Sequence, residues 1–339
     1  MRLYAAFDLH ATNSYCAVID EKRRKIFGRR LPNDPQVILD TIDAYRPDIA
    51  GVVVESTYNW YWLVDMLKDA GYPVYLANPA ATKKYDGLKH ADDKTDAFWL
   101  AHLLQQGILP TGYIYPRELR IVRDLLRNRA RLVRQRSSLI VSLQNTMAAY
   151  RGRRLGANEI KRLRTDHVAL FFADDEVLTL IGRANKESID FLTRQILRIE
   201  KEVEERVGTI EGYRNLQTIS GVGKILSLTI MLETGPIERF GKVGNYASYC
   251  RLVPATRVSN GKNKGAGNKR CGNKYLAWAF AEAAEFARRN DEHARMFFNR
   301  KAAKTNVMTA YAALSHKLAR AAYYVMRDGV EFDPMKLFR

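Results

Sequence analysis

The sequence predicts a mixed α/β domain, a helical arm and a mainly α-helical C-terminal domain. Three observations carry this expectation. Over the first hundred residues, short apolar runs of strand length alternate with stretches of helical period. From Leu119 to Met147 an apolar residue recurs at every seventh position. Finally, an alanine-rich helical stretch beginning at Tyr275 follows a basic, glycine-rich segment.

The N-terminal domain is expected to begin as a β-meander, because two apolar runs flank a short polar break at residues 11–14. The continuously apolar run before Glu55 is typical of a buried central strand. Pro35 suits the first turn of a helix, and Gly71 suits the end of one. The expected strands are residues 3–7, 15–19, 25–29, 50–55 and 73–79, and the expected helices are residues 34–46, 59–72 and a segment that begins near Asp92.

Pro116 is expected to open a long helix with a coiled-coil stripe at Leu119, Leu126, Val133, Ile140 and Met147. Residues 174–208 resume the apolar pattern, so the two segments could pair as an antiparallel arm. A linker or dimerisation element accounts for the apolar stripe. It does not account for the eight arginines among residues 117–136, which only two acidic residues offset. The predicted domains are residues 1–113, 114–210 and 211–339.

The charge of the chain is strongly positive and unevenly distributed. The formal net charge is +18, yet residues 1–113 carry 13 Lys and Arg against 14 Asp and Glu. The basic excess therefore lies in residues 114–339, which points to a polyanion, with nucleic acid favoured over an anionic membrane. No apolar run is long enough to span a bilayer, and three cysteines at irregular spacing indicate reduced thiols. These features predict a cytoplasmic protein.

Two features of the C-terminal domain suit contacts with phosphate. Gly221 and Gly223 separate two apolar helical segments, which is typical of a helix-hairpin-helix turn, although a plain helix connection is about as well supported. The predicted loop at 257–274 holds six basic residues, four glycines and no acidic residue. The predicted nucleic-acid-binding residues are Arg120, Arg123, Arg127, Arg134, Gly221, Gly223, Lys224, Arg257, Lys262, Lys264, Lys269, Arg270 and Lys274.

Four carboxylates are expected to form a metal site. Asp93 and Asp96 share a face near a predicted helix N-terminus, where like charges repel unless a cation binds. Asp8 and Glu55 each follow an apolar strand. Taken singly, Asp8 is better explained as a turn residue and Glu55 as a helix N-terminal acid. Taken together, the four acids favour Mg²⁺-dependent phosphoryl transfer. His10 could line this site, but a packed or surface histidine is the favoured interpretation.

The stretches "FDLH", "VVVEST" and "DDKTDAFWLA", followed by "LQTISGVG" and "LVPATRVSNGKNKGAGNKRCGNKYL", resemble the DEDD insertion-sequence transposases related to the Piv invertase. The resemblance covers about residues 3–290. It implies an RNase H-like (RuvC-like) N-terminal domain and a C-terminal transposase domain with a catalytic serine. The residues that match are Asp8, Glu55, Asp93, Asp96 and Ser259. Asp92 is the alternative third acid, and Asn260 stands where many relatives have glycine.

The resemblance further implies a nucleoid-associated recombinase that cuts and rejoins DNA under the direction of an element-encoded guide RNA. It would use two Mg²⁺ ions, or Mn²⁺ in their place, and a phosphoserine link through Ser259. A homo-oligomer, dimer or tetramer, is expected through the coiled-coil arm, and the serine could act in cis or in trans. The rival hypotheses are a RuvC-like junction endonuclease, in which Ser259 only binds phosphate, and a non-catalytic nucleic-acid scaffold.

Overall fold

The computed structural model describes residues 1–82, 93–253, 256–260, 262–266 and 271–338. The chain divides into two compact units, Met1–Arg117 and Glu118–Arg339. Each unit has its own hydrophobic core.

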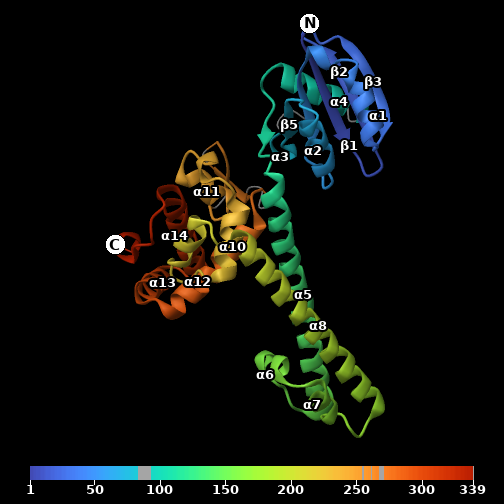
Figure 1. The fold of residues 1–339 in the computed structure, drawn as a ribbon. Coiled ribbons are helices and arrows are strands. Elements are labelled where there is room, and N and C mark those ends of the chain that lie inside the picture. The colour runs from blue at the N-terminus through green and yellow to red at the C-terminus, as the bar shows by residue number, and fades with distance from the viewer. Residues whose placement is uncertain (83–92, 254–255, 261, 267–270, 339) are drawn as a thin grey trace. The chain divides into compact units, whose positions relative to one another are not determined.

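A six-stranded mixed sheet forms the centre of the N-terminal unit, with the strand order β3-β2-β1-β4-β5-β6 (Figure 1). The first three strands make the expected antiparallel meander, and β4 and β5 continue the sheet in parallel with β1. Strand β6 has two residues and was not predicted from the sequence. The strands are β1 (Leu3–Leu9), β2 (Asn13–Asp20), β3 (Lys25–Pro32), β4 (Ile49–Glu55), β5 (Val74–Ala77) and β6 (Thr111–Gly112).

Helices pack on both faces of this sheet. One face of β1 and β4, including Phe7 and Val54, packs against α1 and α2, and the other face, including Ala6 and Val53, packs against α4. Alanines on both α4 and the strands allow the helix to approach the sheet closely. The helices are α1 (Pro35–Asp43), η1 (Arg46–Asp48), α2 (Tyr61–Asp69), α3 (Pro79–Thr82) and α4 (Asp93–Gln105).

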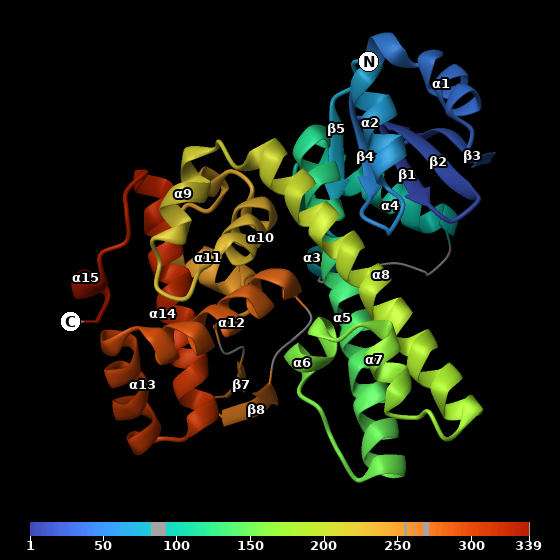
Figure 2. The same ribbon diagram turned by 60° about the horizontal axis from the view of Figure 1, so that its bottom comes forward.

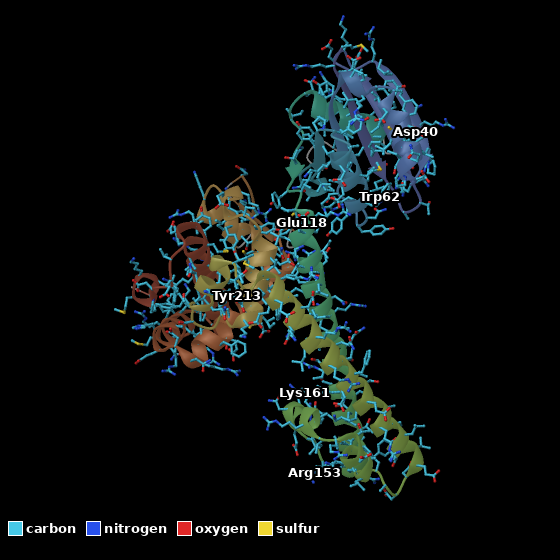
Figure 3. The ribbon with its side chains drawn as sticks, in the orientation of Figure 1. Asp40, Trp62, Glu118, Arg153, Lys161 and Tyr213 are labelled. Carbon is cyan, nitrogen blue, oxygen red and sulfur yellow. The ribbon has the colours of Figure 1, made fainter. Side chains whose placement is uncertain are left out.

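Two long helices, α5 (Arg117–Arg151) and α8 (Glu176–Val207), form the predicted arm. Their side chains meet in antiparallel order, because Arg129 of α5 binds Glu200 while Met147 packs in one cluster with Ile189. The short helices α6 (Ala157–Arg162) and α7 (Thr165–Leu170) connect them. Figure 3 labels Lys161 on α6 and Arg153 on the segment before it, both at this connecting end of the arm. The two helices are confirmed; whether they pack as a coiled coil stays a prediction.

The rest of the C-terminal unit is mainly helical, as expected, and small residues make much of its core. A difference lies at 257–274, where a loop was expected: the structure has a two-stranded antiparallel hairpin, labelled β7 and β8 in Figure 2. Asn260 has a φ of 51°, and Asn-Gly is the dipeptide that best forms such a turn. The elements are α9 (Glu211–Gln217), α10 (Lys224–Thr234), η3 (Ile237–Arg239), α11 (Val243–Tyr249), β7 (Thr256–Ser259), β8 (Lys262–Ala266), α12 (Lys274–Asn290), α13 (Glu292–Lys304), α14 (Val307–Asp328) and α15 (Pro334–Phe338).

None of the helices in the described residues combines the length and the apolar character that crossing a membrane requires. The three cysteines are free thiols, with Cys16 and Cys250 buried and Cys271 exposed.

Candidate active site

Asp8 and Glu55 meet at the carboxyl ends of neighbouring strands. The register pairs Phe7 of β1 with Val54 of β4, so the next residue of each strand is an acid. Side chains alternate along a strand, and these two follow Ala6 and Val53 by two positions on the face that α4 covers. The side chain of Asp8 hydrogen-bonds with that of Glu55, and Asp8 is only 5% exposed. The parallel pairing thus brings two of the predicted acids together.

Helix α4 adds the second pair of acids. It begins at Asp93 and carries Asp96 one turn later, and both stand close enough to Asp8 for their charges to act on it. Nε2 of His10 lies 3.5 Å from Oδ2 of Asp8 and 3.2 Å from Oδ2 of Asp93. The ligand atoms of Asp8, His10 and Asp93 all lie within 4.8 Å of one another. The expected convergence of carboxylates therefore occurs within the N-terminal unit.

Burial raises the pKa of the Asp8 carboxyl above its usual value, because the charged form loses hydration. The hydrogen bond with Glu55 and the charge of His10 offset part of this rise. The negative charges of Asp93 and Asp96 add to it. A cation bound at this cluster would favour the charged form of Asp8 and so act against the rise in its pKa.

The pKa of Asp93 shifts the other way. Nη2 of Arg30 donates to Oδ2 of Asp93 at 2.5 Å, and this hydrogen bond lowers the pKa of Asp93. Arg30 lies on β3, where the register pairs it with Tyr15, which in turn pairs with Asp8. Arg30 was not among the predicted site residues, since no local pattern indicates which residue of a third strand is in line with Asp8. Its register is a property of the assembled sheet.

Two hydrogen bonds to its carbonyl oxygen fix the backbone of His10. The amide groups of Asn33 and Asn59 both donate to the carbonyl oxygen of His10, at 3.0 and 2.9 Å. This places the imidazole between two acids, whereas the sequence analysis favoured a packed or surface position. Its spacing of two residues from Asp8 was the available signal.

The residues of the cluster fit a divalent metal ion. The carboxylates supply hard oxygen ligands, which Mg²⁺ prefers, and their mutual repulsion is relieved when a cation binds. His10 offers an additional nitrogen ligand or a positive charge of its own when protonated. Asp92, the alternative third acid, lies outside the described residues.

Ser259 is the last residue of β7, and its backbone pairs with Lys262 of β8. Arg257 and Lys264 also lie on this hairpin, whereas Lys269 and Arg270 fall outside the described residues. The exposed Lys274 begins α12, and its ammonium group lies over the ring of Tyr275.

The arginines of α5 differ in their surroundings. Arg120 is only 2% exposed, and Arg134 is exposed. Arg127 donates from Nε and Nη2 to the two carboxylate oxygens of Glu233, at 2.6 and 2.7 Å. Burial lowers the pKa of Arg127, but the hydrogen bonds to Glu233 outweigh this effect and raise it.

Arg123 and Lys224 also have acidic neighbours. Arg123 lies 3.5 Å from Asp124, and Lys224 donates to Glu204 at 2.7 Å. To bind a phosphate, each of these basic side chains would have to give up its carboxylate partner. Their roles in nucleic-acid binding remain predictions.

The expected turn between two helices is present, and its two glycines differ. Gly221 has a φ of 84°, and a Cβ there would lie 2.2 Å from the carbonyl oxygen of Ala283 and 2.6 Å from the amide nitrogen of Ala287. Gly223 precedes α10, and a Cβ there would have no neighbour within 4 Å. Gly221 therefore serves close packing of the turn against α12, a role that the sequence analysis did not separate from phosphate binding.

Two protein families match the chain. Residues 5–151 match a DEDD transposase domain of the IS110 type, described as a transposase, and residues 213–299 match the transposase IS116/IS110/IS902 family. Together the matches cover about two thirds of the 339 residues. The chain belongs to the IS110/IS116/IS902 family of transposases. All four clustered acids lie in the first matched region of this transposase, and Ser259 and the Gly221 turn lie in the second.

Individual transposases are similar at lower identity. A probable family 20 transposase of Pseudomonas aeruginosa is 24% identical over 224 residues, which cover 64% of each chain. The transposase for insertion sequence element IS1111A of Coxiella burnetii is 25% identical, over 76% of this chain and 70% of the relative. The transposase for IS1328 of Yersinia enterocolitica is 23% identical, over 83% and 85%. The match thus spans just under two thirds of the Pseudomonas relative and more of the other two.

Proposed function

We propose that this transposase cuts and rejoins DNA at the ends of an insertion sequence. The observation that carries the proposal is the gathering of Asp8, Glu55, Asp93 and Asp96 at one end of a mixed sheet in a chain of this family. The arrangement suits an RNase H-like (RuvC-like) nuclease domain. A basic remainder of the chain suits a nucleic-acid substrate.

Asp8, Glu55, Asp93 and Asp96 would hold two Mg²⁺ ions, or Mn²⁺ in their place. When bound, such ions neutralise charge on the scissile phosphate and stabilise the attacking and leaving oxygens. Asp8 must be ionised to act as a ligand, and a bound cation would oppose the burial and the neighbouring negative charges that raise its pKa. Arg30 and His10 would orient Asp93 and neutralise excess negative charge until then.

Ser259 is the proposed nucleophile. Its Oγ would attack the phosphorus, forming a phosphoserine bond as the bond to one deoxyribose oxygen breaks. The serine proton passes to solvent, and the departing oxygen takes up a proton. Rejoining is the reverse reaction with another DNA hydroxyl as the attacking group. A serine hydroxyl requires activation, so this step depends on the acidic site or on a base nearby.

The proposed partners follow from charge and family. DNA ends and target would contact the basic C-terminal unit mainly through phosphates, and a structured guide RNA would be recognised by shape. A homo-oligomer would form through the α5 and α8 arm, whose two helices expose apolar side chains, among them Ile121, Val141, Phe191 and Leu197. Sequence choice would rest with the RNA.

The test uses the full chain expressed with its own insertion sequence, cloned with flanking DNA. Joined element ends are detected by amplification across the new junction, and protein bound covalently to DNA is detected after denaturation. Asp8→Asn and Ser259→Ala should each abolish joining, and Ser259→Ala should also abolish the adduct. A Ser259→Ala variant that still joins ends would overturn the serine mechanism.

The second candidate is a metal-dependent junction endonuclease, which the acid cluster alone would support. In that case Ser259→Ala keeps Mg²⁺-dependent cleavage of a four-way DNA junction, and Asp8→Asn loses it. A non-catalytic scaffold predicts that neither substitution matters and that Mg²⁺ leaves the melting temperature of the protein unchanged.

A further inference from the structure

Glu233 is a buried carboxylate that the proposed chemistry does not use. It lies on α10, is 3% exposed, and receives two hydrogen bonds from Arg127 of α5. Its Oε2 also accepts a hydrogen bond from Nδ2 of Asn273, at 2.7 Å. A buried carboxylate is tolerated when it is paired and hydrogen-bonded, and Glu233 is both. It therefore links three parts of the C-terminal unit.

Asn273 is where the β7–β8 hairpin region joins α12. Its Oδ1 accepts from the backbone N–H groups of Tyr275 and Leu276, at 2.8 and 3.2 Å, and so caps the helix. Its own backbone N–H donates to the carbonyl oxygen of Tyr249, at 2.6 Å. The side chain is 8% exposed. One amide group thus caps α12 with its oxygen and binds Glu233 with its nitrogen.

The residue before it is held equally closely. Gly272 has a φ of 90°, and a Cβ there would lie 2.5 Å from the carbonyl oxygen of Tyr249. Nε of Arg251 donates to the carbonyl oxygen of Gly272 at 3.0 Å. Arg251 and Gly272 flank the hairpin in the sequence, so this bond closes the base of the segment that carries Ser259.

Arg127 completes the connection to the arm. Its guanidinium group spans both oxygens of Glu233, lies 4.7 Å from the ring centre of Tyr275, and has Asp124 at 3.5 Å from Nη1. A bidentate pair of this kind fixes orientation as well as distance. The partners come from α5, α10 and the start of α12, which the chain connects only through long intervening segments.

We propose that Glu233, Arg127 and Asn273 are positioning residues that anchor the base of the β7–β8 hairpin to the arm helix α5, and so hold the backbone of Ser259 in place for strand cleavage. The catalytic part of this inference rests on the function proposed above. It also reassigns Arg127 from a phosphate contact to an internal anchor.

The main test replaces Asn273 by Asp. The carboxylate keeps an oxygen to cap α12, but it removes the donor to Glu233 and places a second negative charge beside it. Asn306→Asp is the matched control, because Asn306 caps α14 through Thr309 at an exposed site. Glu233→Gln is a further variant, because its carboxamide has an NH₂ group in place of one of the two oxygens that accept from Arg127 and Asn273, and an NH₂ group cannot accept. Arg127→Lys is a third variant, which keeps the charge and loses the bidentate geometry.

The first readout is hydrogen exchange of the backbone amides of residues 256–266 in the metal-free full-length protein. Exchange in Asn273→Asp and Arg127→Lys should be faster by roughly 5- to 150-fold, the factor for ~1–3 kcal/mol when a buried hydrogen bond is lost. Exchange in Glu233→Gln should also be faster, and Asn306→Asp should match the wild type. Unchanged exchange in Asn273→Asp and Arg127→Lys, or an equal effect of Asn306→Asp, overturns the anchor.

The second readout is the rate of the covalent adduct through Ser259, measured beside the Kd for duplex DNA in EDTA. The adduct rate should fall in Asn273→Asp and in Glu233→Gln while the Kd stays within about twofold, and Asn306→Asp should keep the wild-type rate. A hairpin that exchanges faster with an unchanged adduct rate overturns the positioning role. A wild type that shows the anchor but forms no adduct overturns the proposed serine chemistry instead, so the two failures are distinguishable.

Discussion

Replacing Gly221 by alanine should destabilise the C-terminal unit strongly. Its φ of 84° lies in the left-handed region, which costs a residue with a Cβ ~1–2 kcal/mol. The new methyl group would also lie 2.2 and 2.6 Å from backbone atoms of Ala283 and Ala287, and relieving such overlap costs ~1–3 kcal/mol. The free energy of unfolding should therefore fall by about 2–5 kcal/mol, since the neighbouring atoms belong to the backbone of α12 and cannot rotate away.

The assay is calorimetry of the full-length chain together with hydrogen exchange in α12. A unit of this size should lose roughly 4–20 °C of melting temperature, at ~2–4 °C for each kcal/mol. Gly223→Ala is the control, because it has a negative φ and an open surrounding, and it should cost no more than ~1 kcal/mol. A Gly221→Ala variant that melts within 1 °C of the wild type would refute the packing argument and return the turn to a role in phosphate binding.

Three further predictions concern charge. Asp8 has a raised pKa, so its contribution to stability is complete below the usual value of 3.8 and is lost as the pH rises through its folded value. Asp8→Asn should therefore raise the melting temperature of the protein in EDTA at pH 7 but not at pH 3. A lower melting temperature at pH 7 would contradict this. Arg30→Gln removes the guanidinium group that lowers the pKa of Asp93 and that would compete with a metal ion for its carboxylate. The Mg²⁺ concentration that gives half of the maximal thermal stabilisation should therefore fall severalfold. A rise in this concentration would show that Arg30 supports metal binding. Hydrogen bonds from Arg288, Tyr311 and Arg289 lower the pKa of Glu285 to about 2. Glu285→Gln should therefore melt at a lower temperature than the wild type at pH 6, and this difference should shrink as the pH falls from 4.5 towards 2. A difference in melting temperature that does not depend on pH would show that the charge of Glu285 is not its cause.

Local patterns predicted most of the N-terminal unit. The apolar runs at residues 3–7 and 15–19 became β1 and β2, and the run before Glu55 became β4. These assignments held because strand and helix periods are set by neighbouring residues. The two-residue β6 escaped notice, since so short a pairing depends on β5 lying beside it. The β7–β8 hairpin was expected as a loop, although Asn260-Gly261 was a signal for a tight turn.

The acids of the site were also open to sequence analysis. Glu55 ends a strand, Asp8 is the last residue but one of another, and Asp93 and Asp96 lie in the first turn of a helix, all recognisable locally. Their neighbours were harder to predict. Arg30 joins the site only because β3 pairs with β2 and β2 with β1 in one particular register. A register is a property of paired strands, and a shift of one residue would turn Arg30 to the other face of the sheet.

Taken alone, the sequence determined the order of elements, the uneven charge and the family resemblance, because each is carried by residues close together in the chain. Tertiary structure decided which charges meet. Arg127 faces Glu233 across 106 positions, and the pair forms only after α5 and α10 have packed. Arg127 was predicted to contact phosphate because its acidic partner is distant in the chain. Opposite charges far apart in sequence become partners only through packing, which no local pattern records.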